Sequence, residues 1–334
     1  CTSLVTIKGG EQRKKEPTDL DMPTLLAGIP SPRVQPLIDP FDLLVTGVGG
    51  TGVVTVGALI TMAAHLEGKG ASVLDFTGFA QKFGTVLSFI RIGNSPDDLN
   101  QVRIDEGAAD AVIGCDIVVS SAPKASAHYR KGCKIALNTA LMPTGDIVLH
   151  RDADLRVSER EAVIRQAVGS ENVDPMDANL LAEQLLGDAV FANVMMLGFA
   201  WQHGLVPLDE LSIKQAIMLN GVAISKNQTA FDLGRVVAAA PEKIAAVTKD
   251  TPPVDQSLDE LITHRTDFLI KYQNAAYAKR YRKIVETFRS ALPVTAPETL
   301  TRCAAKSLFK LMAYKDEYEV ARLLTNRGFQ EELD

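Results

Sequence analysis

A glycine-rich segment, Gly47-Val48-Gly49-Gly50-Thr51-Gly52, is the feature that most constrains the fold of this chain. The apolar run before it, residues 41–46, predicts a buried strand, and apolar residues at helical spacing predict a helix over 53–65. Four glycines in six residues let the backbone turn sharply between the two. They also leave backbone N–H groups bare at a helix N-terminus, where the helix dipole favours an anion such as a phosphate. The segment is therefore a candidate phosphate-type cofactor site, and a purely structural turn is the alternative.

A glycine loop in this position also occurs in dinucleotide-binding folds. In that interpretation Asp75, at the end of the next predicted strand (71–75), holds a ribose. Only ten residues separate Asp75 from the following predicted strand, 86–92. A parallel crossover with its helix usually takes about a dozen residues or more. A loop that returns directly into the third strand fits this spacing better, so an independent NAD(P)-binding oxidoreductase is the secondary hypothesis.

Gln81 and Lys82 lie on this second loop. In the usual α/β topology, the loops that follow the first two strands gather at one edge of the sheet. Lys82 then brings a cation close to an anion held by the glycine loop. We therefore treat Gln81 and Lys82 as candidate cofactor-binding residues, with a solvated surface lysine as the alternative.

The order of predicted elements indicates a Rossmann-like, three-layer α/β domain with a mixed sheet over residues 41–240. Helices dominate the second part of this domain, from residue 153 onward. The end of a helix is expected at 112–113, and further strands are expected at 117–119, 134–137 and 146–149.

The segments on either side of this domain have a different character. Residues 1–40 carry five prolines between Pro23 and Pro40, which predicts an extended linker from an upstream domain. Residues 241–334 predict an all-α C-terminal extension, with one long amphipathic helix over 257–291.

Charge and hydropathy exclude two kinds of partner. The chain of 334 residues has a net charge of −6, and it contains no apolar run long enough to span a bilayer. One predicted helix combines basic residues with tyrosines, as nucleic-acid-binding helices do. Because the chain is acidic overall, we expect a solvated face or an intersubunit contact there, and neither nucleic acid nor membrane as a partner. The residues concerned are Lys271, Lys279, Arg280, Arg282, Lys283 and Arg289, with Tyr272, Tyr277 and Tyr281.

No catalytic group is recognisable in the sequence. The five histidines are scattered, and none belongs to an HxH or HExxH pair. The chain has neither a GxSxG nor a GxxxxGK[ST] motif. The four cysteines form no CxxC motif, which for Cys115, Cys133 and Cys303 favours reduced thiols in a cytoplasmic protein.

Several segments together carry a family resemblance. Residues 47–55, 78–92, 138–145 and 191–198 resemble the gamma (catalytic) domain of 2-oxoacid:ferredoxin oxidoreductases. In the tail, residues 272–278 and 310–322 look like the C-terminal extension of the large, fused bacterial indolepyruvate ferredoxin oxidoreductases. The resemblance therefore covers essentially the whole chain.

The first residue also fits this resemblance. Residues 1–10 are similar to a segment that follows the thiamine-diphosphate domain in such fused enzymes, where the cysteine ends a stretch that holds an iron–sulfur cluster. The resemblance implies that Cys1 is a metal ligand whose partners lie upstream, since a lone cysteine cannot hold a cluster. An unpaired cysteine is the alternative.

The resemblance implies the following chemistry. A 2-oxoacid such as indolepyruvate is decarboxylated oxidatively with thiamine diphosphate and Mg2+, electrons pass through [4Fe-4S] clusters to ferredoxin, and coenzyme A takes the acyl group. Upstream domains of the same polypeptide bind most of these cofactors, and the enzyme is a homodimer. The phosphates of coenzyme A suit the glycine loop and Lys82. A non-catalytic dimerisation scaffold is a further alternative.

Overall fold

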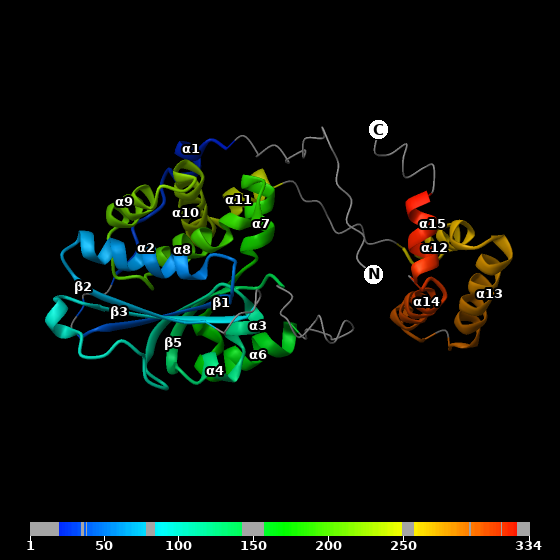
Figure 1. Cartoon of the computed structure of the whole chain (residues 1–334), viewed down its shortest axis with the longest axis horizontal. Coiled ribbons are helices and arrows are strands. Elements are labelled where there is room, and N and C mark those ends of the chain that lie inside the picture. The colour runs from blue at the N-terminus through cyan, green and yellow to red at the C-terminus, as the bar shows by residue number, and fades with distance from the viewer. Residues whose placement is uncertain are drawn as a thin grey trace. The chain divides into compact units, whose positions relative to one another are not determined.

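The computed structural model describes residues 20–34, 37, 39–77, 84–141, 157–248, 257–293, 295–314 and 316–325. Its contacts divide the chain into two compact units, an α/β unit within Arg13–Asp250 and a helical unit that includes Thr251–Asp334 (Figure 1). Each unit is considered by itself below.

A six-stranded sheet forms the centre of the α/β unit, in the order β2-β3-β1-β4-β5-β6. Strands β1, β4, β5 and β6 run parallel, whereas β3 is antiparallel to both of its neighbours, β1 and β2. The predicted mixed sheet is confirmed, and so is the direct return from the second strand into the third. The strands are β1 (Phe41–Val48), β2 (Gly70–Thr77), β3 (Thr85–Gly93), β4 (Ala109–Gly114), β5 (Tyr129–Asn138) and β6 (Val173–Met176).

Helices cover both faces of the sheet and complete the three layers (Figure 1). Side chains alternate along β1, so Leu43 and Val45 enter one hydrophobic core while Leu44 and Val48 enter the other. The first face is covered by α2 (Val53–Leu66), α7 (Ala178–Leu186), α8 (Ala192–Gln202), α9 (Glu210–Asn220) and α10 (Ile224–Ala239). The second is covered by α3 (Ile117–Ser120), α4 (Pro123–Ser126) and α6 (Val157–Val168).

Two glycines let α8 and α10 approach each other closely. A Cβ atom on Gly198 of α8 would lie 1.9 Å from the backbone oxygen of Phe231, and one on Gly234 of α10 would lie 2.0 Å from that of Met195. Any side chain at either position would therefore push the two helices apart.

The structure corrects several expectations for the α/β unit. The strand expected at 117–119 is helix α3, because the Asp116 side chain accepts a hydrogen bond from the backbone N–H of Val119 at 2.8 Å and caps a helix. Residues 112–113, expected at the end of a helix, lie instead in strand β4, where they pair with both β1 and β5. Strand β6, four residues long, was not expected. Within the segment expected to be extended, residues 22–26 form α1 (Met22–Leu26), and after α10 the chain continues as α11 (Pro241–Val247). The strand expected at 146–149 lies outside the described residues.

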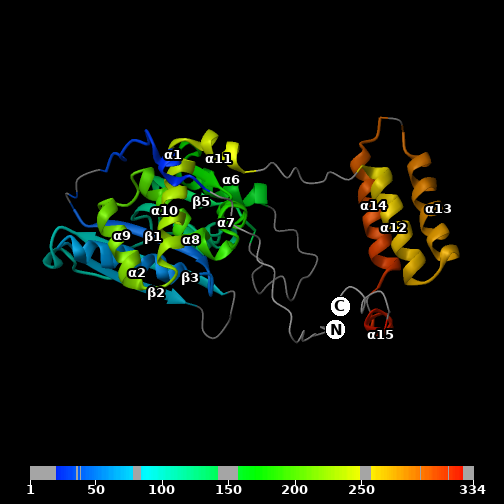
Figure 2. The ribbon, with the colours of Figure 1, turned by 90° about the horizontal axis from the view of Figure 1, so that it is seen from above.

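The helical unit consists of α12 (Leu258–Tyr272), α13 (Ala275–Ala291), α14 (Glu298–Met312) and α15 (Glu317–Thr325). Helices α12, α13 and α14 pack against one another around a common apolar core (Figure 2). The single helix expected over 257–291 is two helices, because the side chain of Asn274 accepts a hydrogen bond from Tyr277 N–H at 2.9 Å and starts a new helix. The all-α character of the extension is confirmed.

Candidate cofactor-binding site

The glycine loop lies at the carboxyl edge of the parallel strands, between β1 and α2. The backbone N–H of Gly49 donates to the carbonyl oxygen of Gly84, which precedes β3, at 2.7 Å. Gly50 and Gly52 have φ angles of 88° and 99°, a left-handed region that favours glycine. Gly52 also precedes the first residue of α2. The sequence prediction of a sharp turn from strand to helix is thus confirmed.

The glycines of this loop have different neighbours. A Cβ atom on Gly47 would lie 2.6 Å from Cγ2 of Val53, and one on Gly49 would lie 3.3 Å from the Gly84 oxygen, so packing requires these two to be small. A Cβ atom on Gly50 would meet nothing within 4 Å. Part of the loop is therefore needed for the turn itself, whereas Gly50 borders open space.

Several amides of the loop are available to an anion. The hydroxyl of Thr51 donates to the carbonyl oxygen of Val48 at 2.8 Å, and the Thr51 N–H points to the same oxygen at 3.4 Å. Within the described ranges, the N–H groups of Gly50, Gly52, Val53 and Val54 have no acceptor. Amides at the positive end of a helix dipole fit a phosphate oxygen.

Asn193 in α8 fixes this loop from the side. Its side-chain amide donates to the backbone oxygen of Thr51 at 2.7 Å and to the Thr51 hydroxyl at 3.3 Å. Sequence reasoning did not single out Asn193 as a site residue. Its only signal was its position in the segment 191–198, which contributes to the family resemblance.

The second loop leaves the sheet at the same edge. Val48 pairs with Thr85 and Thr77 pairs with Val86, so the end of β2 and the start of β3 lie at the edge of the sheet where the glycine loop begins. Gln81 and Lys82 themselves lie outside the described residues, as does Cys1. Asp75 is within β2 and accepts a hydrogen bond from the hydroxyl of Ser88 on β3. Strands β2 and β3 are antiparallel neighbours, whereas a dinucleotide-binding unit continues through a second parallel crossover.

The groups behind the loop are structural. Burial, with a smaller contribution from the carboxylate of Asp116, raises the pKa of the Cys115 thiol to about 12, so Cys115 is not a thiolate nucleophile at neutral pH. The Asn138 amide donates to the Cys115 carbonyl oxygen at 3.1 Å and to Oδ1 of Asn179 at 2.8 Å. Its Oδ1 accepts from two backbone N–H groups, at residues 140 and 178. These bonds join the ends of β4 and β5 to the start of α7.

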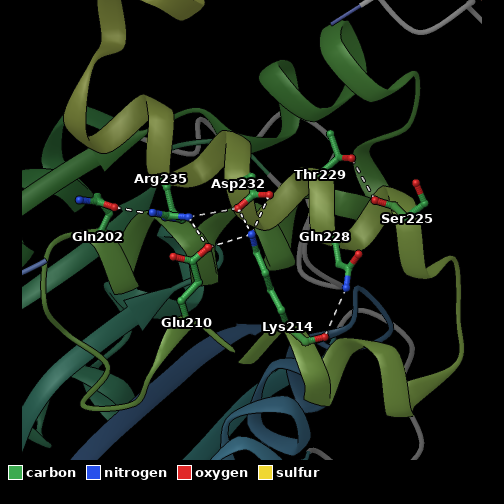
Figure 3. Close-up of polar contacts among 8 residues, drawn as sticks. All are labelled: Gln202, Glu210, Lys214, Ser225, Gln228, Thr229, Asp232 and Arg235. Carbon is green, nitrogen blue, oxygen red and sulfur yellow. Dashed lines mark hydrogen bonds and ion pairs between the residues drawn. The ribbon is translucent and has the colours of Figure 1, made fainter. Parts of the chain in front are cut away.

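A second polar cluster lies between α8, α9 and α10 (Figure 3). Nη1 of Arg235 is 2.6 Å from Oε1 of Glu210 and 3.3 Å from Oδ1 of Asp232, and Nζ of Lys214 is 2.8 Å from each of these oxygens. Burial acts to lower the pKa of Lys214, but hydrogen bonds to Asp232 and Glu210 outweigh it and raise that pKa. Nε of Arg235 also donates to Oε1 of Gln202 in α8 at 3.3 Å, so the cluster joins three helices. Because two cations and two carboxylates balance, it presents no net charge to a ligand.

The remaining features of the α/β unit do not add to the site. A cavity of about 640 Å³ lies at the amino edge of the parallel strands, beside Phe41 and Asp110, and none of the predicted site residues lines it. The described residues contain no group of three or more His, Cys, Asp or Glu side chains that could hold a metal ion. In the part of the chain that the structure describes, no helix combines the length and apolar character needed to cross a membrane.

Fold and loop together define a three-layer α/β domain with amides open to an anion and a helical unit after it. Residues 42–237 match the family described as Pyruvate ferredoxin/flavodoxin oxidoreductase. That match covers more than half of the chain, and the chain belongs to this family. Its α/β unit is homologous to the gamma-type subunits of 2-oxoacid:ferredoxin oxidoreductases. Residues 258–334 match a family of unknown function, DUF6537.

Individual relatives match the α/β unit. The indolepyruvate oxidoreductase subunit IorB of Thermococcus kodakarensis is 28% identical over 206 residues, which are 61% of this chain and 98% of the relative. The pyruvate synthase subunit PorC of Methanothermobacter thermautotrophicus is 27% identical over 173 residues, 49% of this chain and 77% of the relative. A solved gamma subunit of keto/oxoacid ferredoxin oxidoreductase from Geobacter sulfurreducens is 18% identical, covers 59% of this chain and 98% of its own, and gives a TM-score of 0.43.

Proposed function

We propose that this chain is the C-terminal part of a thiamine-diphosphate- and iron–sulfur-dependent 2-oxoacid:ferredoxin oxidoreductase of the indolepyruvate type. The family match of residues 42–237 is the observation that carries the proposal. Relatives named as indolepyruvate oxidoreductase subunits support the substrate class. The reaction is oxidative decarboxylation of a 2-oxoacid to acyl-CoA and CO2, with ferredoxin as the electron acceptor, in a homodimer.

The redox cofactors belong to other domains in this proposal. Thiamine diphosphate with Mg2+ supplies the carbon nucleophile for decarboxylation. The described residues offer no ligand set for a metal ion or a [4Fe-4S] cluster. Cys1, which lies outside the described residues, is proposed as one ligand of a cluster completed by upstream cysteines.

The contribution of this chain is to bind the acyl acceptor. The open amides of Gly50, Gly52 and the first turn of α2 fit a phosphate of coenzyme A, and Asn193 holds the loop in that conformation. Gln81 and Lys82, on the loop after β2, are proposed to add a polar contact and a cation. The chain supplies no catalytic group of its own in this proposal and packs on the thiamine site.

Titrating coenzyme A into the intact enzyme tests the loop assignment. In Gly50→Asp a carboxylate lies beside the open amides, and in Lys82→Ala a cation is lost, so we expect each to weaken coenzyme A binding about tenfold or more. Pantetheine, which lacks the phosphates, should bind equally to all three proteins. Isothermal calorimetry measures both ligands.

Gly107→Asp is the matched control for Gly50→Asp. Gly107 also has a positive φ, 69°, and a Cβ atom there would meet nothing within 4 Å, so the two changes carry similar backbone strain. Unchanged coenzyme A affinity in both Gly50→Asp and Lys82→Ala removes the loop assignment. Absence of 2-oxoacid-dependent reduction of any acceptor by the intact enzyme removes the proposed reaction.

A further inference from the structure

Helix α13 is strongly cationic. Five of the six charged side chains in Ala275–Ala291 are positive. Two of these cations have local partners: Arg282 lies 2.8 Å from Glu286, and Arg289 lies 2.7 Å from Asp259 of α12. Glu286 of this helix and Asp259 of its neighbour are therefore already paired with cations on one side of α13.

Three further cations of α13 are unpaired. Lys279, Arg280 and Lys283 are exposed and have no hydrogen-bond or ion-pair partner among residues 257–293, 295–314 and 316–325. Helical spacing places them together, opposite the stripe of α13 that enters the bundle core. Lys283 follows Lys279 by four residues and Arg280 by three, and such like-charge pairs destabilise a helix. The three side chains are therefore free to meet counter-charges supplied by another molecule.

The aromatic side chains beside this cluster do not favour nucleic acid. The hydroxyls of Tyr272, Tyr277 and Tyr281 donate to backbone oxygens within and just after α14, at 3.0–3.2 Å. These rings are engaged inside the helical unit, whereas single-stranded nucleic acid requires exposed rings for stacking. A membrane surface is equally disfavoured, because the main apolar stripe of α13 is buried in the bundle core.

An acidic protein surface fits the observations. Ile284, 42% exposed, lies four residues after Arg280 and offers the apolar contact that protein interfaces combine with basic side chains. We propose that the α13 cationic face, made of Lys279, Arg280, Lys283 and Ile284, docks the acidic electron-carrier protein that takes electrons from the enzyme. This inference rests on the proposed function, and charge complementarity selects the partner.

Steady-state assays of the intact enzyme with a 2-oxoacid and an acidic ferredoxin test the docking face. In Lys279→Glu/Lys283→Glu, KM for ferredoxin rises about tenfold at low ionic strength, kcat changes little, and the dependence of KM on salt becomes weaker. Turnover with a small dye as acceptor stays at the wild-type rate. The variant keeps a like-charge pair at positions 279 and 283 and makes the pair of Arg280 with position 283 attractive, so a loss of helix stability does not explain a higher KM.

Lys124→Glu/Lys131→Glu, which changes two exposed lysines of the α/β unit, is the matched control with the same change in net charge. Equal KM values in the two double variants overturn the proposal. The proposal is also wrong if the wild type self-associates and Lys279→Glu/Lys283→Glu abolishes this association, because the face then binds a second copy of the chain. It is likewise wrong if the wild type binds fluorescent duplex DNA and the same variant does not, because the face then binds nucleic acid.

Failure of the proposed function gives a different result. If the wild-type enzyme reduces neither dye nor ferredoxin with any 2-oxoacid, the proposed reaction is wrong. Titrating ferredoxin into the 334-residue chain, followed by sedimentation velocity with the same two double variants, still decides whether the α13 cationic face binds it. If ferredoxin does not bind the chain, or if it binds equally well when Lys279 and Lys283 are replaced, the inference is wrong.

Discussion

The side-chain amide of Asn193 donates to the backbone oxygen of Thr51 at 2.7 Å, across 142 positions of sequence. Asn193 is 5% exposed, so water competes little for this bond. The contact joins the start of α8 to the glycine loop and holds the loop amides in place before a ligand binds. Such preorganisation lowers the entropy cost of binding.

Asn193→Asp should weaken both the fold and the loop. The carboxylate has nearly the volume of the amide but cannot donate, so two oxygens face each other where a hydrogen bond was. We expect a loss of about 2 kcal/mol of unfolding free energy, together with weaker coenzyme A binding. Urea unfolding and calorimetry measure the two effects. Asn100→Asp, at an exposed position, is the control and should leave both values unchanged.

The close contact between α8 and α10 predicts that adding one methyl group at Gly234 strongly lowers the stability of the fold. In Gly234→Ala the new Cβ would overlap the backbone oxygen of Met195, which cannot rotate away as a side chain can. Separating two packed helices should cost about 3 kcal/mol and lower the melting temperature by roughly 6–12 °C. Differential scanning calorimetry measures the change.

Gly57→Ala is the matched helical control for this prediction. A Cβ at Gly57 of α2 would meet its nearest neighbour, Cγ2 of Val73, at 3.4 Å, an ordinary contact distance. Because alanine has the higher helix propensity, the change should be neutral or stabilising by up to about 1 kcal/mol. Equal melting temperatures for the two variants would show that α8 and α10 are not in close contact.

The polar cluster of Figure 3 predicts different costs for buried and exposed ion pairs. Arg235→Met leaves Glu210 and Asp232 with only Lys214 between them, in a region where Arg235 is 7% exposed. We expect a loss of about 3 kcal/mol, because a carboxylate loses its partner in a poorly hydrated site. Arg282→Met, in an exposed pair, should change stability by less than about 0.5 kcal/mol. Similar losses in both would contradict a structural role for the cluster.

Local sequence patterns were sufficient for the central features of the fold. The apolar run before Gly47 and the helical spacing after Gly52 predicted β1 and α2. The short gap after Asp75 predicted a direct return, because a crossover helix does not fit in it, and β2 and β3 are indeed antiparallel. These features depend on chain length and periodicity, which a single sequence contains.

Other features depend on single side chains or on distant contacts. Ile117 and its neighbours have strand propensity, but Asp116 caps a helix there and overrides it. The amphipathic pattern continues across Asn274, yet its side chain starts a new helix. The contact of Asn193 with Thr51 arises only after α8 packs against the sheet, so no local pattern in the sequence indicates it.

His203 supplies a pH-dependent contribution to stability. Its ring contacts Phe199 edge to face at a centroid distance of 4.6 Å, and Nδ1 lies 3.5 Å from Oδ2 of Asp174. Burial lowers the pKa of His203 below its ordinary value of 6.5; Asp174 acts to raise it and Lys134 to lower it, and the net shift is downward. The folded protein therefore binds this proton less readily than the unfolded chain does.

The sign of the pH effect follows from that shift. As pH falls through 6.5, the unfolded chain takes up the proton first, so unfolding free energy decreases until the pH passes below the folded-state pKa of His203. His203→Gln removes this contribution, and its melting temperature should fall less than that of the wild type between pH 7.5 and 5.5. The exposed His264→Gln is the control and should follow the wild type. Calorimetric scans at several pH values in this range measure the melting temperatures. If the melting temperatures of the wild type and His203→Gln fall in parallel, burial of the His203 ring does not disfavour its charged form.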